Sequence, residues 1–173
     1  KVRRAQSQAM ASRDYTAAAY EILADLALFH EGGIDHPLLM PHREVENILV
    51  ILITSDRGLA GPYNTNIVRA ALDFAAEQAA QVSYITVGKK GRDLLVRRGA
   101  KVIAEFTNLP DTPSILDIAA IARTAIDDFL IEQVDEVYVA YTDFVNTLNQ
   151  EPVVQRLLPL APEQKHMGEM GSH

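Results

Sequence analysis

The residues best suited to chemistry lie in one short segment, residues 54–66, with the sequence TSDRGLAGPYNTN. The segment follows a β-branched and aliphatic run that predicts a strand, and it leads into a predicted helix. In open α/β sheets this crevice is where ligands bind, beside a helix N-terminus that can hold an anion. Arg57 could pair with a phosphate, while Gly58 and Gly61 would let the backbone turn tightly. A small nucleotide- or phosphate-binding α/β protein is therefore one hypothesis.

The spacing of the glycines argues against that hypothesis. The segment has neither the three-glycine dinucleotide fingerprint nor the Gly-Lys-Ser/Thr of a Walker motif. Pro62 also lacks the backbone N–H that a phosphate cradle would use. A second glycine-containing turn, VGKKGRD around Gly88 and Gly91, is typical of a strand-to-helix connection.

No catalytic constellation accompanies the segment. Ser55 stands beside Asp56, but no histidine falls in the predicted core elements to act as a general base. Asp127 and Asp128 are neighbours on a predicted helix, so their side chains point about 100° apart and face water. We therefore expect no catalytic residue in this chain.

The histidines and the absence of cysteine give no indication of a metal site. Three of the five histidines, His30, His36 and His42, fall at irregular spacing in a proline-interrupted stretch. That pattern favours surface loop histidines over metal ligands. The chain has no cysteine, which excludes disulfides and thiolate metal sites. We expect neither a metal nor a cofactor.

Composition and charge narrow the class of protein. With 173 residues, 19.1 kDa and 48% apolar residues, the chain can fill one packed core. The formal net charge of -7 argues against a nucleic-acid binder. The longest apolar run, residues 48–53, suits a buried strand and is too short to cross a bilayer.

Four positively charged residues precede the first acidic residue of the chain. They have two interpretations: a solvated helix surface, or a basic end that meets an acidic partner. These cations are Lys1, Arg3, Arg4 and Arg13.

Residues 1–29 predict one long helix, which would extend about 43 Å. They are rich in Ala, contain neither Gly nor Pro, and repeat small or apolar residues in steps of four and three, as in a coiled-coil seam. The seam residues are Ala5, Ala9, Ser12, Thr16, Ala19, Leu23 and Leu26. No second predicted helix is long enough to pair along the whole seam, so we expect a missing partner helix.

The rest of the chain divides into a linker, a globular domain and a tail. Residues 30–44 predict a linker because each Pro disfavours helix in the residue before it. Residues 45–160 alternate between strand and helix patterns, and residues 161–173 resemble a tail or a remnant of cloning. The strand patterns lie at 47–54, 82–87, 101–106, 136–142 and 153–158. The helix patterns lie at 64–81, 91–98 and 114–133.

The order of these elements predicts the fold class. Strand and helix in repetition favour an α/β, Rossmann-like, mostly parallel five-stranded sheet with helices on both faces. The last two strands are joined by residues 143–151 and are close enough to form an antiparallel hairpin at one edge. Asn64 or Thr65 is the expected N-cap of the first helix of the domain, and Ser114 that of the last.

Several of these segments together resemble the gamma subunit of F-type ATP synthases. The resemblance extends over nearly all of residues 1–160, with the motifs in the same order and spacing. Many family members carry Cys where this chain has Ala60 and Gly where it has Pro62. The matching segments are KVRRAQSQAMASRDY, ITSDRGLAGPYNTNI, VGKKGRDLL, LPDTPS and YTDFVNTLNQEPVVQRLLPL.

The resemblance implies a mechanical role. Members of the family have an α/β domain inserted between two long helices that form an antiparallel coiled coil. By this comparison the chain is a fragment that lacks the N-terminal end and the C-terminal helix. The implied protein is the central rotor stalk, which transmits torque between the membrane c-ring and the catalytic alpha/beta ring and is not itself catalytic. Its implied location is peripheral to a bacterial cell membrane, on the cytoplasmic face.

The resemblance also implies partners and contact residues. The partners would be the alpha and beta subunits, the epsilon subunit and the c-ring, with no nucleic acid and no nucleotide bound directly by this chain. Asp56, Arg57 and Gly58 match a turn that faces the stator ring in the family. The basic residues of the first helix would lie near acidic segments of the beta subunits. These are Lys1, Arg3, Arg4 and Arg13.

Overall fold

The computed structural model describes residues 37–57, 62–109, 115–146 and 149–160, together with Ala17 and Glu21. Both of these isolated positions are helical. The rest of the predicted helix over residues 1–29, with its coiled-coil seam, lies outside the described residues. The same is true of five site candidates and of the tail at residues 161–173. The five candidates are Lys1, Arg3, Arg4, Arg13 and Gly58.

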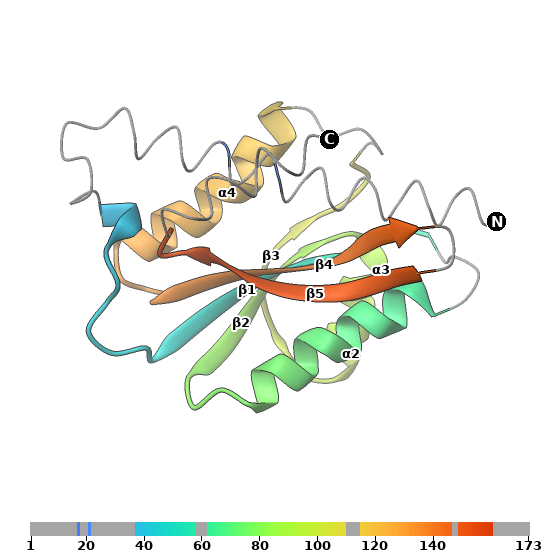
Figure 1. The fold of residues 1–173 in the computed structure, drawn as a ribbon, viewed down its shortest axis with the longest axis horizontal. Coiled ribbons are helices and arrows are strands. Elements are labelled where there is room, and N and C mark those ends of the chain that lie inside the picture. Colours follow the sequence, from blue (N-terminus) through green and yellow to red (C-terminus); the bar gives the residue numbers. More distant parts are fainter. Residues whose placement is uncertain are drawn as a thin grey trace.

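One five-stranded sheet organises the described part of the chain (Figure 1). The strand order is β3-β2-β1-β4-β5, with β5 antiparallel to β4 and the other neighbours parallel. The predicted α/β fold with a mostly parallel sheet and an antiparallel edge hairpin is confirmed. The strands are β1 (Asn47–Ile53), β2 (Gln81–Val87), β3 (Lys101–Phe106), β4 (Glu136–Asn146) and β5 (Asn149–Leu158).

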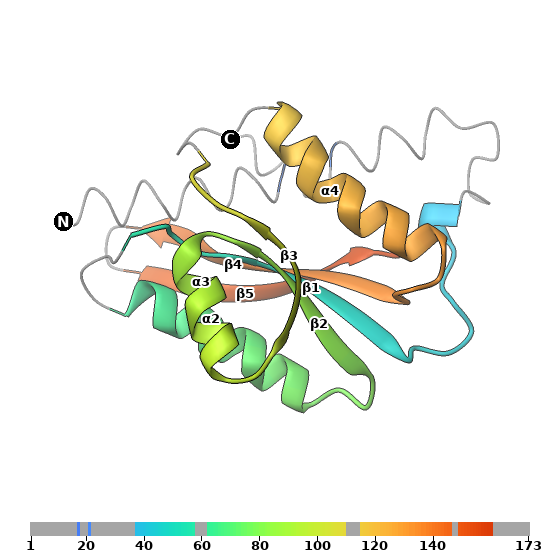
Figure 2. The same cartoon turned by 180° about the vertical axis from the view of Figure 1, so that it is seen from behind.

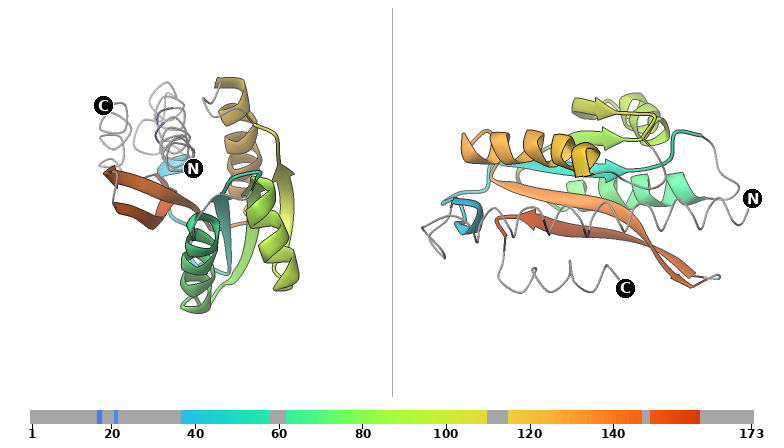
Figure 3. Two further views of the ribbon diagram at one scale, coloured as in Figure 1. Left: turned by 90° about the vertical axis from the view of Figure 1, so that its right-hand side faces the viewer. Right: turned by 90° about the horizontal axis from the view of Figure 1, so that it is seen from above.

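Helices cover both faces of the sheet (Figures 2 and 3). The helices α2 (Tyr63–Ala76) and α3 (Lys89–Arg97) cover one face, and α4 (Ile115–Leu130) lies on the other with the 3-10 helix η2 (Pro37–Leu39). The central strand β1 is therefore buried on both sides, and only Asn47 among its residues is partly exposed. This two-sided burial explains why its sequence, NILVILI, is a continuous apolar run. None of the helices in the described ranges has the length and apolar character that crossing a bilayer requires.

Alternate residues of β1 belong to two separate hydrophobic clusters. Leu49, Ile51 and Ile53 pack toward α4, where Phe129 is fully buried. Ile48, Val50 and Leu52 pack toward α2 and α3. Successive side chains of a strand point to opposite faces, so one seven-residue strand supplies the centre of both cores.

The helices differ from their predicted bounds at their ends. α2 ends at Ala76 instead of residue 81, because Glu77 and Gln78 form i-to-i−3 hydrogen bonds that close the last turn. α3 begins two residues earlier than predicted, at Lys89. α4 ends at Leu130 instead of residue 133, and Glu132 adopts a positive φ of 61° beyond it.

The edge hairpin is longer than its sequence pattern indicated. β4 continues to Asn146 and β5 starts at Asn149, so most of residues 143–151, predicted as a connection, are paired strand. Polar residues and Pro152 obscured the pattern there. Pro is tolerated on an edge strand, where one side of the backbone has no neighbouring strand to receive its hydrogen bonds.

The residues directly before β1 pack against the sheet. Leu38 of η2 is 2% exposed and belongs to the cluster under α4. His42 Nδ1 lies 2.9 Å from Asp135 Oδ1, and its ring stacks on Phe129 at a centroid distance of 4.4 Å. The prediction that His42 is a surface loop histidine is therefore wrong, because its partners are distant in the sequence. His30 and His36 lie outside the described residues.

Phe129 provides a direct test of the core under α4. Replacing it with Ala should lower the free energy of unfolding by about 3–5 kcal/mol, because a fully buried aromatic ring is removed. Urea denaturation followed by circular dichroism measures the change. The control is Leu116→Ala on the same helix, which should stay within about 0.5 kcal/mol because Leu116 is 82% exposed. Equal losses for the two variants would contradict this assignment of the core.

Candidate functional site

The candidate site lies where the parallel strands β1, β2 and β3 end, and Asp56 is at its centre. One carboxylate oxygen of Asp56 accepts a hydrogen bond from the backbone N–H of Lys89, at 3.1 Å. The other accepts from the backbone N–H of Asn108, at 2.9 Å. Lys89 begins α3 after β2, and Asn108 lies in the turn after β3. A single side chain at the end of β1 therefore connects the ends of all three strands.

The N-terminus of α3 is capped by the segment that follows β1. A helix leaves its first four amides without partners inside the helix, and these amides form an anion site when they are available. In α3 all four are engaged by atoms of this chain. The bonds are Gly88 N to Phe106 O at 2.8 Å, Lys89 N to Asp56 Oδ1 at 3.1 Å, Lys90 N to Ser55 O at 3.1 Å and Gly91 N to Thr54 Oγ1 at 2.8 Å. The anion at this helix end is the carboxylate of Asp56.

The two glycines of the VGKKGRD turn allow this close approach. Gly88 has a φ of 104°, and a Cβ added to it would lie 2.2 Å from the carbonyl oxygen of Thr54. A Cβ at Gly91 would lie 2.8 Å from two atoms of the Thr54 side chain. The prediction that this turn joins a strand to a helix is confirmed, since Gly88 directly follows β2 and is the N-cap residue of α3. Its glycines make room for the end of β1.

Ser55 and Asn64 hold the turn that carries Arg57. The Ser55 N–H donates to Asn64 Oδ1 at 3.1 Å, and Asn64 Nδ2 donates to Ser55 Oγ at 2.8 Å. The Ser55 hydroxyl donates in turn to the carbonyl oxygen of Arg57, so it is engaged in structure. The Arg57 side chain is exposed, and in the described part of the chain no carboxylate forms an ion pair with it.

The prediction that Asn64 or Thr65 caps α2 is wrong. The N-cap residue of α2 is Pro62, with no side-chain capping bond, and its carbonyl accepts from the N–H of Asn66 at 2.8 Å. Asn64 falls inside the first turn, and its amide reaches back to Ser55 at the end of β1. The residue type was suited to capping, but its partner lies in the preceding strand-to-helix connection.

The other candidate residues do not assemble into a reactive group. Asp127 is exposed and Asp128 is partly buried, both on α4. Within the described ranges no group of three or more His, Asp or Glu side chains could hold a metal ion. The sequence indicated Asp56 as a contact residue and missed its capping role, as it missed that of Thr54. Both contacts join residues 33 or 37 positions apart, so no local capping pattern could reveal them.

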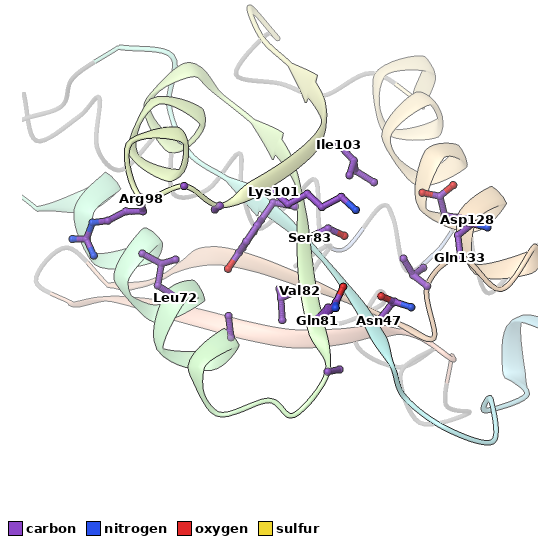
Figure 4. A pocket seen from close by; sticks show the side chains of 16 residues that line it. Asn47, Leu72, Gln81, Val82, Ser83, Arg98, Lys101, Ile103, Asp128 and Gln133 are labelled. Carbon is purple, nitrogen blue, oxygen red and sulfur yellow. The ribbon is translucent and has the colours of Figure 1, made fainter.

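A cavity of about 510 Å³ lies at the other end of the parallel strands, where β1, β2 and β3 begin (Figure 4). Asn47, Ser83 and Lys101 line it from the beginnings of β1, β2 and β3, while Asp128 and Gln133 line it from the end of α4 and beyond. Ligands of parallel α/β sheets bind at the carboxyl ends of the strands. This cavity is at the amino ends and is separate from the candidate site.

Comparison with known proteins decides the family. A family model described as ATP synthase matches residues 1–173. The ATP synthase gamma chain of Herpetosiphon aurantiacus is 43% identical over 169 residues, covering 92% of this chain. That of Dehalococcoides mccartyi is 42% identical over 163 residues, covering 94%. This chain belongs to the ATP synthase gamma family. It spans 57% of the length of each of these two relatives.

Solved structures share the fold of this gamma-family chain. A chain of the Tetrahymena thermophila mitochondrial ATP synthase, from a structure of its central stalk and c-ring, aligns with a TM-score of 0.60. The sequence identity is 20%, and the alignment covers 99% of this chain and 87% of the other. A chain of the Euglena gracilis mitochondrial ATP synthase rotor aligns with a TM-score of 0.55 at 18% identity, covering 96% and 63%.

Asp56 and Arg57 provide a matched test of the site. Asp56→Ala should lower the free energy of unfolding by about 1–3 kcal/mol, because the amides of Lys89 and Asn108 lose their acceptor. Urea denaturation measures the loss, and hydrogen exchange should speed up at those two amides. Arg57→Ala is the control and should stay within about 0.5 kcal/mol, because its side chain is exposed. Unchanged exchange at Lys89 and Asn108 in Asp56→Ala would contradict the capping role.

Proposed function

We propose that this chain is part of the central rotor stalk of a proton-translocating F-type ATP synthase and transmits torque between the c-ring and the catalytic alpha/beta ring. The observation that carries the proposal is its similarity to bacterial gamma chains over at least 92% of its length. The protein supplies no catalytic group in this role. ATP synthesis and hydrolysis take place in the alpha/beta ring, and the stalk forces the catalytic sites through their states in turn.

The construction of the α/β domain suits a part that must transmit force. Two close-packed cores share the central strand β1, and packed interiors deform little. At the carboxyl ends of the strands, Asp56 connects the ends of β1, β2 and β3. The side chains of Thr54 and Asp56, which follow β1, cap the N-terminus of α3. The crevice where an α/β protein would bind a phosphate thus serves to hold the domain together.

The domain arrangement is proposed in the same terms. Residues 1–29 form half of an antiparallel coiled coil, residues 30–44 the linker, residues 45–160 the globular domain and residues 161–173 a tail. The partners are the alpha and beta subunits, the epsilon subunit and the c-ring, with neither nucleic acid nor nucleotide bound by this chain. The location is peripheral to a bacterial cell membrane, on its cytoplasmic face.

The proposed contact residues fall into two groups. The basic residues of the first helix face acidic segments of the beta subunits, and the turn at Asp56, Arg57 and Gly58 faces the stator ring. Within that turn the exposed Arg57 is the side chain that meets the partner, because both carboxylate oxygens of Asp56 accept hydrogen bonds inside the domain. The basic residues are Lys1, Arg3, Arg4 and Arg13.

Arg57→Ala in the full-length subunit, assembled into the membrane complex, tests this assignment. The protons pumped per ATP hydrolysed should fall about threefold, a modest loss because exposed charge pairs contribute little. Fluorescence quenching in inverted vesicles measures pumping, and phosphate release measures hydrolysis. Arg123→Ala, which removes an exposed arginine on α4, is the matched control and should leave the ratio unchanged. A melting temperature that falls in parallel with the ratio would contradict a contact role.

The second candidate, a small nucleotide- or phosphate-binding α/β protein, is favoured by one observation: an exposed arginine stands at the carboxyl edge of the sheet, near the start of α2. Titration of the purified chain with ATP distinguishes the two functions. We expect no saturable binding at micromolar concentrations, because the amides of α3 already have partners. Saturable micromolar binding that is lost in Arg57→Ala would favour this second function.

A further inference from the structure

The chain enters and leaves the sheet at the same place. Leu160, just after β5, donates its backbone N–H to the carbonyl oxygen of Leu38 in η2, at 2.7 Å. Leu38 is 2% exposed and Leu160 is 4% exposed, and both belong to the cluster under α4. Figure 1 shows η2 beside the end of β5, at one extremity of the sheet. The segment that leads into the domain is therefore held against the segment that leads out of it.

A second, polar contact fixes the incoming segment between η2 and β1. His42 Nδ1 contacts Asp135 Oδ1 at 2.9 Å, and the imidazole stacks on Phe129 with an interplanar angle of 19°. The other carboxylate oxygen of Asp135 accepts from the backbone N–H groups of Glu46 and Asn47, at 2.8 and 3.0 Å. The Asp135 N–H donates to the carbonyl oxygen of Asn47, at 2.8 Å. Asp135 thus ties His42 and the first residue of β1 to the beginning of β4.

The electrostatics favour a charged acceptor for His42. Burial raises the pKa of Asp135, which is 8% exposed, but the hydrogen bonds from His42, Asn47 and Glu46 and the charge of His42 lower it. The net effect is a pKa below the ordinary value. The carboxylate therefore stays ionised at neutral pH, and hydrogen bonds to a charged group are the stronger kind.

Two fixed points are required because of how the segment is built. Leu38 and its partly buried neighbour Leu39 hold only the η2 end, and rotation about backbone bonds would leave the chain between η2 and β1 free to turn about that end. The neighbouring side chains of Met40 and Val45 are 51% and 42% exposed and provide little anchorage. With His42 also held, the segment between η2 and β1 is fixed at two separate points and resists rotation.

We propose that His42 and Asp135, together with the paired Leu38 and Leu160, form a torsional anchor that fixes the direction in which the two flanking segments leave the α/β domain. The proposal rests on the proposed function, because it gives these residues a task in torque transfer. His42 and Asp135 are positioning residues that act through the backbone of the segment before β1. Through this anchor, rotation of the flanking segments turns the sheet with them, with little relative motion between the two.

The test uses the full-length subunit assembled into ATP synthase in membrane vesicles. His42→Phe keeps an aromatic ring on Phe129 but removes the hydrogen bond, and Asp135→Asn keeps an acceptor for the strand amides but removes the charge. Each variant should lower the protons pumped per ATP hydrolysed about threefold, because the charge-assisted contact between His42 and Asp135 is lost. The double variant should be no worse than either single variant, because both remove the same contact. Arg43→Ala, an exposed neighbour of His42, is the matched control and should pump as the wild type does.

A second measurement separates an anchor from simple loss of stability. Hydrogen exchange at the amides of Glu46 and Asn47 should speed up in Asp135→Asn, because a neutral amide oxygen replaces their charged acceptor, while the amides of central β1 stay protected. Normal pumping in variants whose Glu46 and Asn47 exchange rapidly would overturn the anchor and leave the proposed function intact. Pumping that falls only in proportion to the melting temperature would also overturn it. Failure of the wild-type subunit to support any pumping would instead overturn the proposed function.

Discussion

The carboxylate of Asp56 holds the carboxyl edge of the sheet together, and the arrangement of that edge depends on it. Its two oxygens accept from the amides of Lys89 and Asn108, which follow β2 and β3, while its own backbone follows β1. Parallel strands are connected by crossovers and have no tight turns between their adjacent ends. A side chain that bridges three such ends supplies a connection that the backbone does not.

The same interaction occupies a part of the fold that binds ligands in other α/β proteins, in keeping with the mechanical role proposed for this chain. In open α/β sheets the helix N-termini at the carboxyl edge bind anions through their amides. Here α3 receives the chain's own carboxylate, a carbonyl oxygen and a hydroxyl, and Gly88 and Gly91 allow Thr54 to approach closely enough to take part. The polar groups that would recognise a ligand elsewhere serve here to fasten one element to the next.

Contacts join the elements of the domain at both ends of the parallel strands, as the proposed transmission of force requires. The central strand β1 contributes side chains to both hydrophobic cores. Because packed interiors transmit strain, displacement of a helix on one face of the sheet changes the packing on the other face. The carboxyl edge is joined through Asp56, and the entering and leaving segments meet through Leu38 and Leu160. The exposed Arg57 stands on a turn whose backbone carbonyl accepts a hydrogen bond from the Ser55 hydroxyl, so this turn is attached to the end of β1.

The family resemblance and the order of the elements could both be predicted from the sequence, because each depends on local patterns of residues. The apolar run of β1 predicted a buried strand, and the alternation of strands with helices predicted the sheet and its antiparallel edge hairpin. Element ends were less accurate, since the closing turn of α2 and the paired polar ends of β4 and β5 leave no periodic signal. The roles of Asp56, Asn64 and His42 could be assigned only from the folded structure. Asp56 and His42 contact partners 33 to 93 residues away in the sequence, and Asn64 contacts Ser55 at the other end of the connection between β1 and α2. These contacts form only when the sheet has brought the strand ends together.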